Sequence, residues 1–242
     1  MDLKGHTALV TGGGQRLGRA FAEALLGRGA DVIVHYGKSA EGAQAVVRHA
    51  EGLGRRAVAL QADLSLPDEA SGLLDRAASH LAPPDLLVNS ASVFENAGFE
   101  QTTLEMWQAH LALNLTAPFL LSQTFARQRQ GHPGAIANLL DWRALRPGAD
   151  HFAYTIAKAG LAAMTLSLAR ALAPSIRVNG LALGAILPPS GAKAPDPAWI
   201  ERVPLRRWAT LDEATDALLF LLAGPDFLTG TILHLDGGRH LT

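Results

Sequence analysis

The chain of 242 residues contains no cysteine. Without thiols it can form neither a disulfide framework nor a thiolate zinc site. Its nine histidines do not show the short spacings that metal ligands usually have, so the sequence predicts no metal centre. The lack of cysteine fits a reducing compartment.

An excess of charge of one sign is also missing, because 21 Lys and Arg residues face 22 Asp and Glu residues and no run of like charge occurs. Nucleic acid or an acidic membrane is therefore not expected as the main partner. The first residues lack the basic start and the apolar segment of a signal peptide. We also expect that no apolar run approaches membrane-spanning length. These absences together predict a soluble, cytoplasmic protein.

What the chain does have is a regular alternation of short apolar runs with longer amphipathic ones. The short runs predict strands at 6–11, 31–36, 57–61, 86–89, 135–140, 177–182 and 232–235. The longer runs predict helices at 17–28, 40–52, 67–81, 103–129, 151–173 and 212–222. Strands separated by helices imply βαβ crossovers and a mostly parallel sheet with helices on both faces. No linker or repeat divides the chain, so residues 1–242 are predicted to form one α/β domain.

Glycines cluster between the first predicted strand and the first predicted helix, where residues 11–18 read TGGGQRLG. At such a turn the backbone can approach a pyrophosphate closely, and the start of the helix offers free N–H groups to it. The alternative is a glycine-rich turn with a purely structural role. The position of the glycines within the strand–helix alternation favours a dinucleotide site.

The end of the second predicted strand indicates which dinucleotide is bound. Dehydrogenases selective for NAD place a carboxylate there to hold the ribose 2′-hydroxyl, but this chain reads HYGKS at 35–39, with no carboxylate before Glu41. Lys38 and Ser39 can instead hold a 2′-phosphate, the first by charge and the second by hydrogen bond. Ser39 can equally cap the next helix. We therefore expect NADPH/NADP as cofactor, with His35 beside its adenine or its phosphate.

Polar residues also follow the later strands. Asp63 follows the third predicted strand, where a carboxylate could meet the adenine amine or cap a helix. Asn89, Ser90 and Ala91 end the fourth strand, at the edge where open α/β sheets bind ligands. Asn114 lies within an otherwise apolar helix, either as a satisfied core amide or as part of a water chain.

Tyr154 and Lys158 are four residues apart in a predicted helix and therefore lie on one face of it. An ammonium beside a phenol favours the phenolate, which lowers the tyrosine pKa from about 10 towards working pH. A tyrosine tuned in this way can pass a proton to or from a substrate. Taken alone, the pattern also fits a packed tyrosine beside a solvated lysine, so its weight depends on its surroundings.

One long irregular stretch, at 184–197, is rich in Gly, Ala and Pro. A loop of this length in a compact domain is either a lid or binding loop, or a connection without a role. We place a substrate loop at about 184–204.

Together these residues resemble the short-chain dehydrogenase/reductase family. The matching features are T-G-x-x-x-x-x-G at 11–18, N-x-A at 89–91, Asn114, Y-x-x-x-K at 154–158 and Asp-Gly-Gly at 236–238. They cover essentially the whole chain in the family's order and spacing. The resemblance implies a Rossmann-like, doubly wound parallel sheet of seven strands, hydride transfer with a nicotinamide cofactor, and a dimer or, as we expect here, a homotetramer built on two long helices. It places these residues at the cofactor: Gly12, Gln15, Arg16, Leu17, His35, Tyr36, Lys38, Ser39, Asp63, Leu64, Asn89, Ser90, Ala91, Tyr154, Lys158, Gly184 and Ile186.

Three departures from the common family pattern make the chain similar to the pteridine reductase branch, which includes bacterial dihydromonapterin reductases. Arg16 stands where most members have Gly, and Asp141 stands where most have a catalytic Ser, thirteen positions before the tyrosine. Ser92, followed by Phe94, replaces the Gly of N-A-G. The HYGKS segment also resembles the NADPH-binding H-Y-x-x-S segment of that branch. A fourth departure, Leu-Gly at 183–184 in place of Pro-Gly, leaves the details of the substrate loop open.

These substitutions suit a pterin, which is a flat, nitrogen-rich bicycle. Phe94 can stack on one ring face, Arg16 can bridge the cofactor pyrophosphate and the pterin oxygen, and Ser92 can bond the amino edge. Asp141 beside Tyr154 can act in the proton relay that reduction of a ring C=N requires. Taken separately, Arg16 could be a solvated arginine, Phe94 ordinary core and Asp141 a turn carboxylate.

The sequence thus predicts an NADPH-dependent reductase that takes a dihydropterin to its tetrahydro form. Its expected catalytic residues are Asp141, Tyr154, Lys158 and Asn114, and its expected substrate-binding residues are Arg16, Ser92, Phe94, Asp141 and Tyr154. The nearest alternative is a reductase of a carbonyl, such as a 3-oxoacyl thioester or a sugar ketone, which is expected to need Ser at position 141. A non-catalytic NADPH-binding sensor or assembly subunit is a second alternative, against which the intact Tyr–Lys pair argues.

Overall fold

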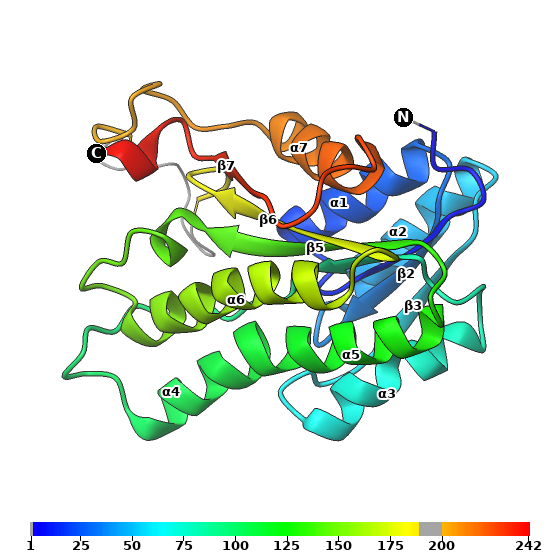
Figure 1. The fold of residues 1–242 in the computed structure, drawn as a ribbon, viewed down its shortest axis with the longest axis horizontal. Coiled ribbons are helices and arrows are strands. Elements are labelled where there is room, and N and C mark those ends of the chain that lie inside the picture. The colour runs from blue at the N-terminus through cyan, green and yellow to red at the C-terminus, as the bar shows by residue number, and fades with distance from the viewer. Residues whose placement is uncertain (1, 189–199) are drawn as a thin grey trace.

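The computed structural model describes residues 2–188 and 200–242 of the chain. Its centre is a sheet of seven parallel strands in the order β3-β2-β1-β4-β5-β6-β7 (Figure 1). The strands are β1 (Thr7–Val10), β2 (Asp31–Tyr36), β3 (Ala57–Gln61), β4 (Leu86–Asn89), β5 (Gly134–Asp141), β6 (Ile176–Leu183) and β7 (Ile232–Leu235). All seven predicted strands are confirmed, with ends that differ by at most one residue.

Helices cover both faces of this sheet (Figure 1). One face carries α1 (Arg16–Gly27), α2 (Ala40–Gly52) and α7 (Leu211–Ala223). The other carries α3 (Pro67–Ala78), α4 (Leu104–Leu111), α5 (Ala117–Arg129) and α6 (Phe152–Ala171). This is the predicted doubly wound α/β architecture.

The strands read as continuous apolar runs because both faces of the sheet are buried. In β1, Leu9 points into the core under α3 and α5, whereas its neighbours Ala8 and Val10 point into the core under α1 and α7. The register extends this row across the sheet, since Leu9 is paired with Ile33 on one side and Leu87 on the other. A strand that alternated between apolar and polar residues would leave polar groups in one of the two cores.

The predicted helix at 103–129 is divided in the structure. Between α4 and α5 the chain forms one π-helical turn, Ala112–Thr116, with Asn114 at its centre. A π-turn widens a helix locally and is common at functional sites. Here it aims the buried amide of Asn114 at the loop after β4.

Helix α6 corrects one expectation. Its 20 residues, with a mean hydropathy of 1.3, are long and apolar enough to cross a membrane by length and composition alone, whereas we expected no run to approach that length. Half of the apolar window is buried against the rest of the molecule, and the helix packs chiefly on β6, α4 and the 3₁₀ turn at 142–144. Core helices of globular proteins meet the same criteria, and the packing accounts for the composition of this one.

The predicted substrate loop begins directly after β6, which ends at Leu183. Its residues 189–199 lie outside the described part of the chain. Described residues on either side border the site described below, among them Gly184, Leu187 and Glu201, whereas Ile186 is not part of its lining.

Candidate active site

The strand order changes direction at β1, since the chain runs outwards through β2 and β3 and then returns to β4. Open α/β sheets bind ligands at the carboxyl ends of their strands at such a point. A cavity of about 920 Å³ opens there. It brings together these predicted site residues: Gly12, Gln15, Arg16, Leu17, Ser90, Ala91, Ser92, Phe94, Asp141, Tyr154, Lys158 and Gly184.

The glycine turn after β1 is held against the loop after β4. Gly12 has φ of +66°, which favours glycine, and a Cβ on it would lie 3.1 Å from Cα of Ala91. Thr11 links the two loops because its hydroxyl oxygen accepts hydrogen bonds from the N–H groups of Ser90 and Ala91, both at 2.9 Å. A larger residue at position 12 would push these loops apart.

The His35 side chain, on β2, stabilises the glycine turn by hydrogen bonding. The Gly12 N–H donates to Nδ1 of His35 at 3.1 Å, and Nε2 of the same ring lies 3.1 Å from the Ala62 carbonyl. Burial lowers the pKa of His35 from 6.5 to about 4, so the ring is neutral. The side chain is 3% exposed and lies outside the cavity lining, so its predicted contact with the cofactor stays a prediction.

The start of α1 suits a pyrophosphate. Gln15, the residue before it, gives no side-chain cap, so the first N–H groups of the helix can serve phosphate oxygens. Arg16 has φ of +50°, a conformation that glycine adopts more easily, and glycine is the residue expected there from the family pattern. Its guanidinium donates to the Pro188 carbonyl at 2.7 Å, so it reaches the segment that follows β6.

The end of β2 suits a phosphorylated ribose. Ser39 makes no side-chain capping bond to α2, so the capping role considered above is absent from the structure. Its hydroxyl lies against the glycine turn, 2.5 Å from where a Cβ on Gly14 would be, while Lys38 is exposed. Asp63, by contrast, accepts from the backbone N–H and the hydroxyl of Ser65, and these bonds are the main reason why its pKa is lowered.

Two buried amides hold the loop after β4. The Asn114 side chain accepts from the Val93 N–H and donates to the Val93 carbonyl, both at 3.0 Å. Asn89 donates to Asn138 at 2.8 Å, and its own Oδ1 is buried without a partner among the described residues. Asn114 is therefore a satisfied amide that positions the segment carrying Ser92 and Phe94, and its catalytic role stays a prediction.

Asp141 and Tyr154 meet at the floor of the cavity. The Tyr154 hydroxyl donates to Oδ2 of Asp141 at 3.3 Å. The other carboxylate oxygen accepts from the Arg143 N–H at 2.8 Å, which fixes the orientation of the carboxyl group. Lys158 donates to the Leu139 carbonyl at 2.7 Å, and its Nζ lies 5.8 Å from the centre of the Tyr154 ring.

Burial, rather than the charge of the Lys158 ammonium, has the largest effect on the pKa values of Asp141 and Tyr154. Desolvation raises the pKa of Asp141, against the opposing effects of Arg143 and Lys158. Desolvation and the negative charge of Asp141 raise the pKa of Tyr154 well above 10, which corrects the expectation that Lys158 would lower it. Burial also lowers the pKa of Lys158 to about 8, which weakens its effect on the phenol. Tyr154 is therefore a neutral phenol in this structure.

Two further residues belong to the site although the sequence analysis did not name them. His151 stacks on Phe94 with ring centres 4.1 Å apart, and Phe94 meets the edge of Tyr154 at 4.7 Å. Phe94 is 41% exposed, so it is not ordinary core. Arg143 is buried and pairs with Asp150 at 3.0 Å. Nothing in the sequence spacing indicates that His151 and Arg143 belong to the site. The left-handed conformation of His151 and the 3₁₀ turn at 142–144 direct their side chains towards it.

The structure also gathers His234, Asp236 and His240, whose potential metal-ligand atoms lie within 4.8 Å of one another. Sequence spacing did not indicate this cluster. The Asp236 carboxylate is already engaged, because it accepts from the N–H groups of Gly238 and His240 and from the His240 ring. Asp236 and His240 therefore form a hydrogen-bonded pair that fixes the turn at 236–240.

A family model described as Enoyl-(Acyl carrier protein) reductase matches residues 14–240. A 3-oxoacyl-[acyl-carrier-protein] reductase of Synechocystis sp. is 30% identical over 240 residues, which cover 98% of this chain and 97% of that protein.

Two solved structures are similar over the same extent. FolM Alternative dihydrofolate reductase 1 from Brucella canis, complexed with NADP, has a TM-score of 0.93 and 31% identity, covering 99% of this chain and 96% of that one. A short chain dehydrogenase from Burkholderia cenocepacia, also with NADP, has a TM-score of 0.92 and 37% identity, covering 99% of both chains. With its glycine turn, its Tyr–Lys pair and its sheet order in place, the chain belongs to the short-chain dehydrogenase/reductase family.

Proposed function

We propose that the protein is an NADPH-dependent reductase of pterins that takes a dihydropterin to its tetrahydro form. The observation that carries the proposal is the hydrogen bond between Asp141 and Tyr154 at the floor of the cavity. A carboxyl group with a raised pKa beside a neutral phenol is suited to protonating a ring nitrogen. A carbonyl reductase would use a serine hydroxyl at the same place.

The cofactor is NADP(H). Its pyrophosphate would lie at the uncapped start of α1, and its 2′-phosphate at Lys38 and Ser39, since no carboxylate ends β2. Both of the solved relatives described above hold NADP, which agrees with this assignment. The orphaned Oδ1 of Asn89 lies buried beside the same loop and is one acceptor left over for a bound group or water.

The pterin would lie above Asp141, between Phe94 and the cofactor. Phe94 offers an exposed aromatic face, already backed by the stacked His151 ring, for a flat bicycle. Arg16, at the start of α1, stands where a guanidinium can serve both a phosphate and a pterin oxygen. Ser92, exposed in the same cavity, can accept from the amino edge.

Bound NADPH supplies the hydride, and the residues of the chain handle the proton. Asp141 holds a proton at higher pH than an ordinary carboxyl group does, because burial raises its pKa. Oδ1 is fixed by the Arg143 N–H, which leaves Oδ2 directed at Tyr154 and the cavity. Asp141 therefore acts as the acid through Tyr154: the phenol gives its own proton to the ring nitrogen, and its oxygen takes the proton from Oδ2 of the protonated Asp141, which becomes a carboxylate. The Lys158 ammonium, bonded to the Leu139 carbonyl, adds a positive charge that stabilises the carboxylate left behind once the proton has gone to the ring, and solvent later returns that proton.

A carbonyl reductase is the second candidate, because the Synechocystis relative is named as a reductase of a 3-oxoacyl thioester. That chemistry requires donors aimed at a carbonyl oxygen. Here a half-buried carboxyl group with a raised pKa occupies the place of the expected serine and makes the pterin the better substrate class.

The experiment is oxidation of NADPH, followed with dihydrobiopterin and with a 3-oxoacyl thioester in parallel. Turnover of the dihydropterin with little turnover of the thioester supports the proposal. Turnover of the thioester alone refutes it and gives Asp141 a structural role. NADPH binding without turnover of either substrate would favour a sensor or assembly subunit.

A further inference from the structure

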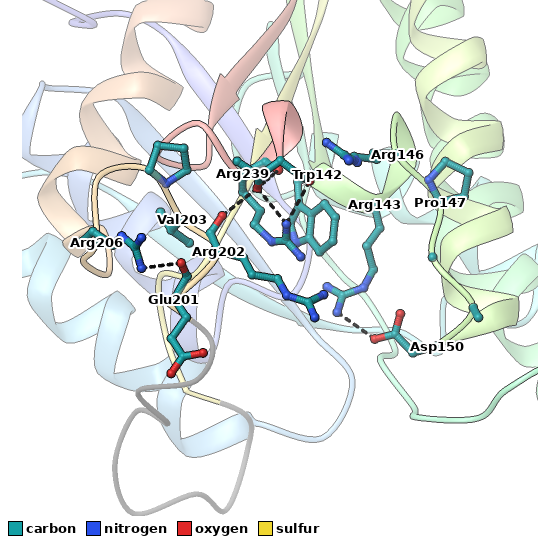
Figure 2. Close-up of a pocket in the computed structure, with 14 residues that line it drawn as sticks. Trp142, Arg143, Arg146, Pro147, Asp150, Glu201, Arg202, Val203, Arg206 and Arg239 are labelled. Atoms are coloured by element: carbon teal, nitrogen blue, oxygen red, sulfur yellow. Dashed lines mark hydrogen bonds and ion pairs between the residues drawn. The ribbon is translucent and has the colours of Figure 1, made fainter.

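A second cavity, of about 840 Å³, adjoins the one described above (Figure 2). Its wall is built from three separate parts of the chain, at 142–150, 201–206 and 239–242. Six residues line both cavities, so the two are continuous: Trp142, Arg143, Glu201, Arg202, Val203 and Arg239. A molecule with its ring above Asp141 can therefore extend a tail into the second cavity.

The second cavity is strongly basic. Five arginines line it, against two carboxylates, Asp150 and Glu201. Asp150 is already paired with Arg143 and His151, both at 3.0 Å. The Glu201 side chain points away from the arginine cluster in Figure 2, and its backbone carbonyl serves Arg206 instead. The arginines thus outnumber the carboxylates that could neutralise them.

Two of these guanidinium groups are held in place by Trp142. Arg143 and Arg239 lie over its ring, with Cζ at 4.7 Å and 4.3 Å from the ring centre. Arg239 is further fixed because its guanidinium donates to the carbonyl and the hydroxyl of Thr242. Such groups are preorganised, so less freedom is lost when they bind a ligand.

Unused donors remain in the cluster. Arg143 is 7% exposed, and its Nε–H is buried without a partner among the described residues. Arg202 and Arg143 extend towards each other across the cavity (Figure 2). The pKa of Arg239 is lowered by burial and then by the positive charges of Arg202, Arg146 and Arg143, so these four groups repel one another. An anion bound among them would reduce this repulsion and would accept hydrogen bonds from their free donors.

We infer that the arginine cavity is a subsite for an anionic tail of the substrate, a carboxylate or a phosphate group borne on the side chain of the pterin. This inference rests on the proposed function, which places the pterin ring above Asp141. It extends that function by naming the class of side chain that the substrate carries. Arg143, Arg146, Arg202 and Arg239 bind the tail, and substrates with an anionic tail are preferred over those with a neutral one. Planar guanidinium groups suit carboxylate and phosphate equally, so the chemistry that they share is what the site recognises.

The first test measures the subsite without the ring. Two probes that lack a pterin, 4-aminobenzoylglutamate and inorganic pyrophosphate, are titrated calorimetrically into the enzyme saturated with NADPH. Saturation keeps pyrophosphate out of the cofactor site. Binding that weakens at least tenfold in Arg146→Gln and in Arg202→Gln supports the inference, since a charged hydrogen bond is worth about a factor of ten or more. Which probe binds tells whether the tail is a dicarboxylate or a phosphate.

Arg48→Gln is the matched control, since Arg48 is exposed on α2. It should bind the probes as the wild type does, and the NADPH affinity of every variant should be unchanged, which shows that the fold is intact. Probe binding that is equal in wild type, Arg146→Gln and Arg202→Gln would overturn the subsite.

The second test separates the subsite from the proposed function. The ratio of kcat/KM for dihydrofolate, which has an anionic tail, to that for dihydrobiopterin, which has a neutral one, is measured in wild type and in Arg146→Gln. A ratio that falls about tenfold in the variant supports the subsite. An unchanged ratio overturns it while pterin reduction stands. Arginine-dependent probe binding without turnover of either pterin would keep the anion subsite and refute the proposed function.

Discussion

The Tyr154 hydroxyl donates to the Asp141 carboxylate across 3.3 Å, in a site where burial raises the pKa of both groups. The two side chains come from different elements, the end of β5 and the first turn of α6. Their meeting adds to the helical Tyr–Lys pair a carboxyl group that holds its proton at higher pH than an ordinary carboxyl group does.

Asp141→Ser should lower kcat/KM for a dihydropterin by about 10²- to 10⁴-fold, the usual size of a general acid's contribution. NADPH affinity should change less than threefold, because Asp141 is expected to touch the substrate side of the site. Steady-state kinetics and fluorescence titration of NADPH measure the two effects. Asp150→Ser is the control, since it removes a carboxylate that pairs with Arg143 but does not contact Tyr154. Equal losses of kcat/KM in the two variants would mean that activity depends on neutralising the charge of Arg143 rather than on an acid at position 141.

The pH dependence of pterin reduction should reflect this acid. A general acid must be protonated, so kcat/KM should fall as pH rises through the raised pKa of Asp141. Lys158, with a pKa of about 8, should add a second loss when its ammonium deprotonates. The residual activity of Asp141→Asn should lack the first loss and keep the second. A wild-type rate that rises steadily from pH 5 to pH 8 would exclude this assignment.

Much of this site could be predicted from the sequence. The parts that could not be predicted depend on burial or on the assembly of distant stretches, which only the folded chain shows. The glycine turn and the Tyr154–Lys158 pair can be predicted because local spacing and element order place them, whereas Asp141 is predicted from the resemblance to the family pattern. The pKa of Tyr154 was predicted in the wrong direction, because an argument from one neighbouring charge leaves out burial. The arginine cavity was missed because its residues come from three distant stretches that only the fold assembles.

Cofactor choice can be tested at the end of β2. Lys38→Glu should weaken NADPH binding at least tenfold, because it replaces a cation beside the 2′-phosphate with an anion. NADH, which lacks this phosphate, should be affected less than threefold. Lys4→Glu makes the same charge change at an exposed position before β1 and should leave both affinities as they are. Parallel losses for NADPH and NADH in Lys38→Glu would place the 2′-phosphate elsewhere.

Asn114 offers a test of positioning. Asn114→Ala leaves the N–H and carbonyl of Val93 without their partners, which should lower the free energy of unfolding by about 1–3 kcal/mol. Because Val93 adjoins Ser92 and Phe94, KM for the pterin should rise more than kcat falls. Asn114→Asp, which keeps an acceptor for the Val93 N–H, should have a KM for the pterin that is closer to the wild-type value than that of Asn114→Ala. A fall in kcat alone would instead support the catalytic role predicted from the sequence.

His35 makes the stability of the fold depend on pH in a defined direction. Its pKa is about 4 in the folded protein and 6.5 when unperturbed, chiefly because the ring is buried. Above pH 6.5 the ring is neutral in both states and adds no dependence. As pH falls from 6.5 towards 4, the unfolded state takes up a proton that the folded state does not, so the free energy of unfolding decreases, by about 3 kcal/mol at the lower end.

Carboxyl groups titrate in the same range, so the contribution of His35 is obtained as a difference between two proteins. The variant His35→Asn keeps an acceptor for the Gly12 N–H and cannot titrate. Urea denaturation at pH 8 and at pH 4.5 should show that wild type loses about 2.5 kcal/mol more than the variant between the two conditions. Equal losses would mean that the ring is protonated without cost in the folded state, and that it cannot be the neutral acceptor that holds the glycine turn.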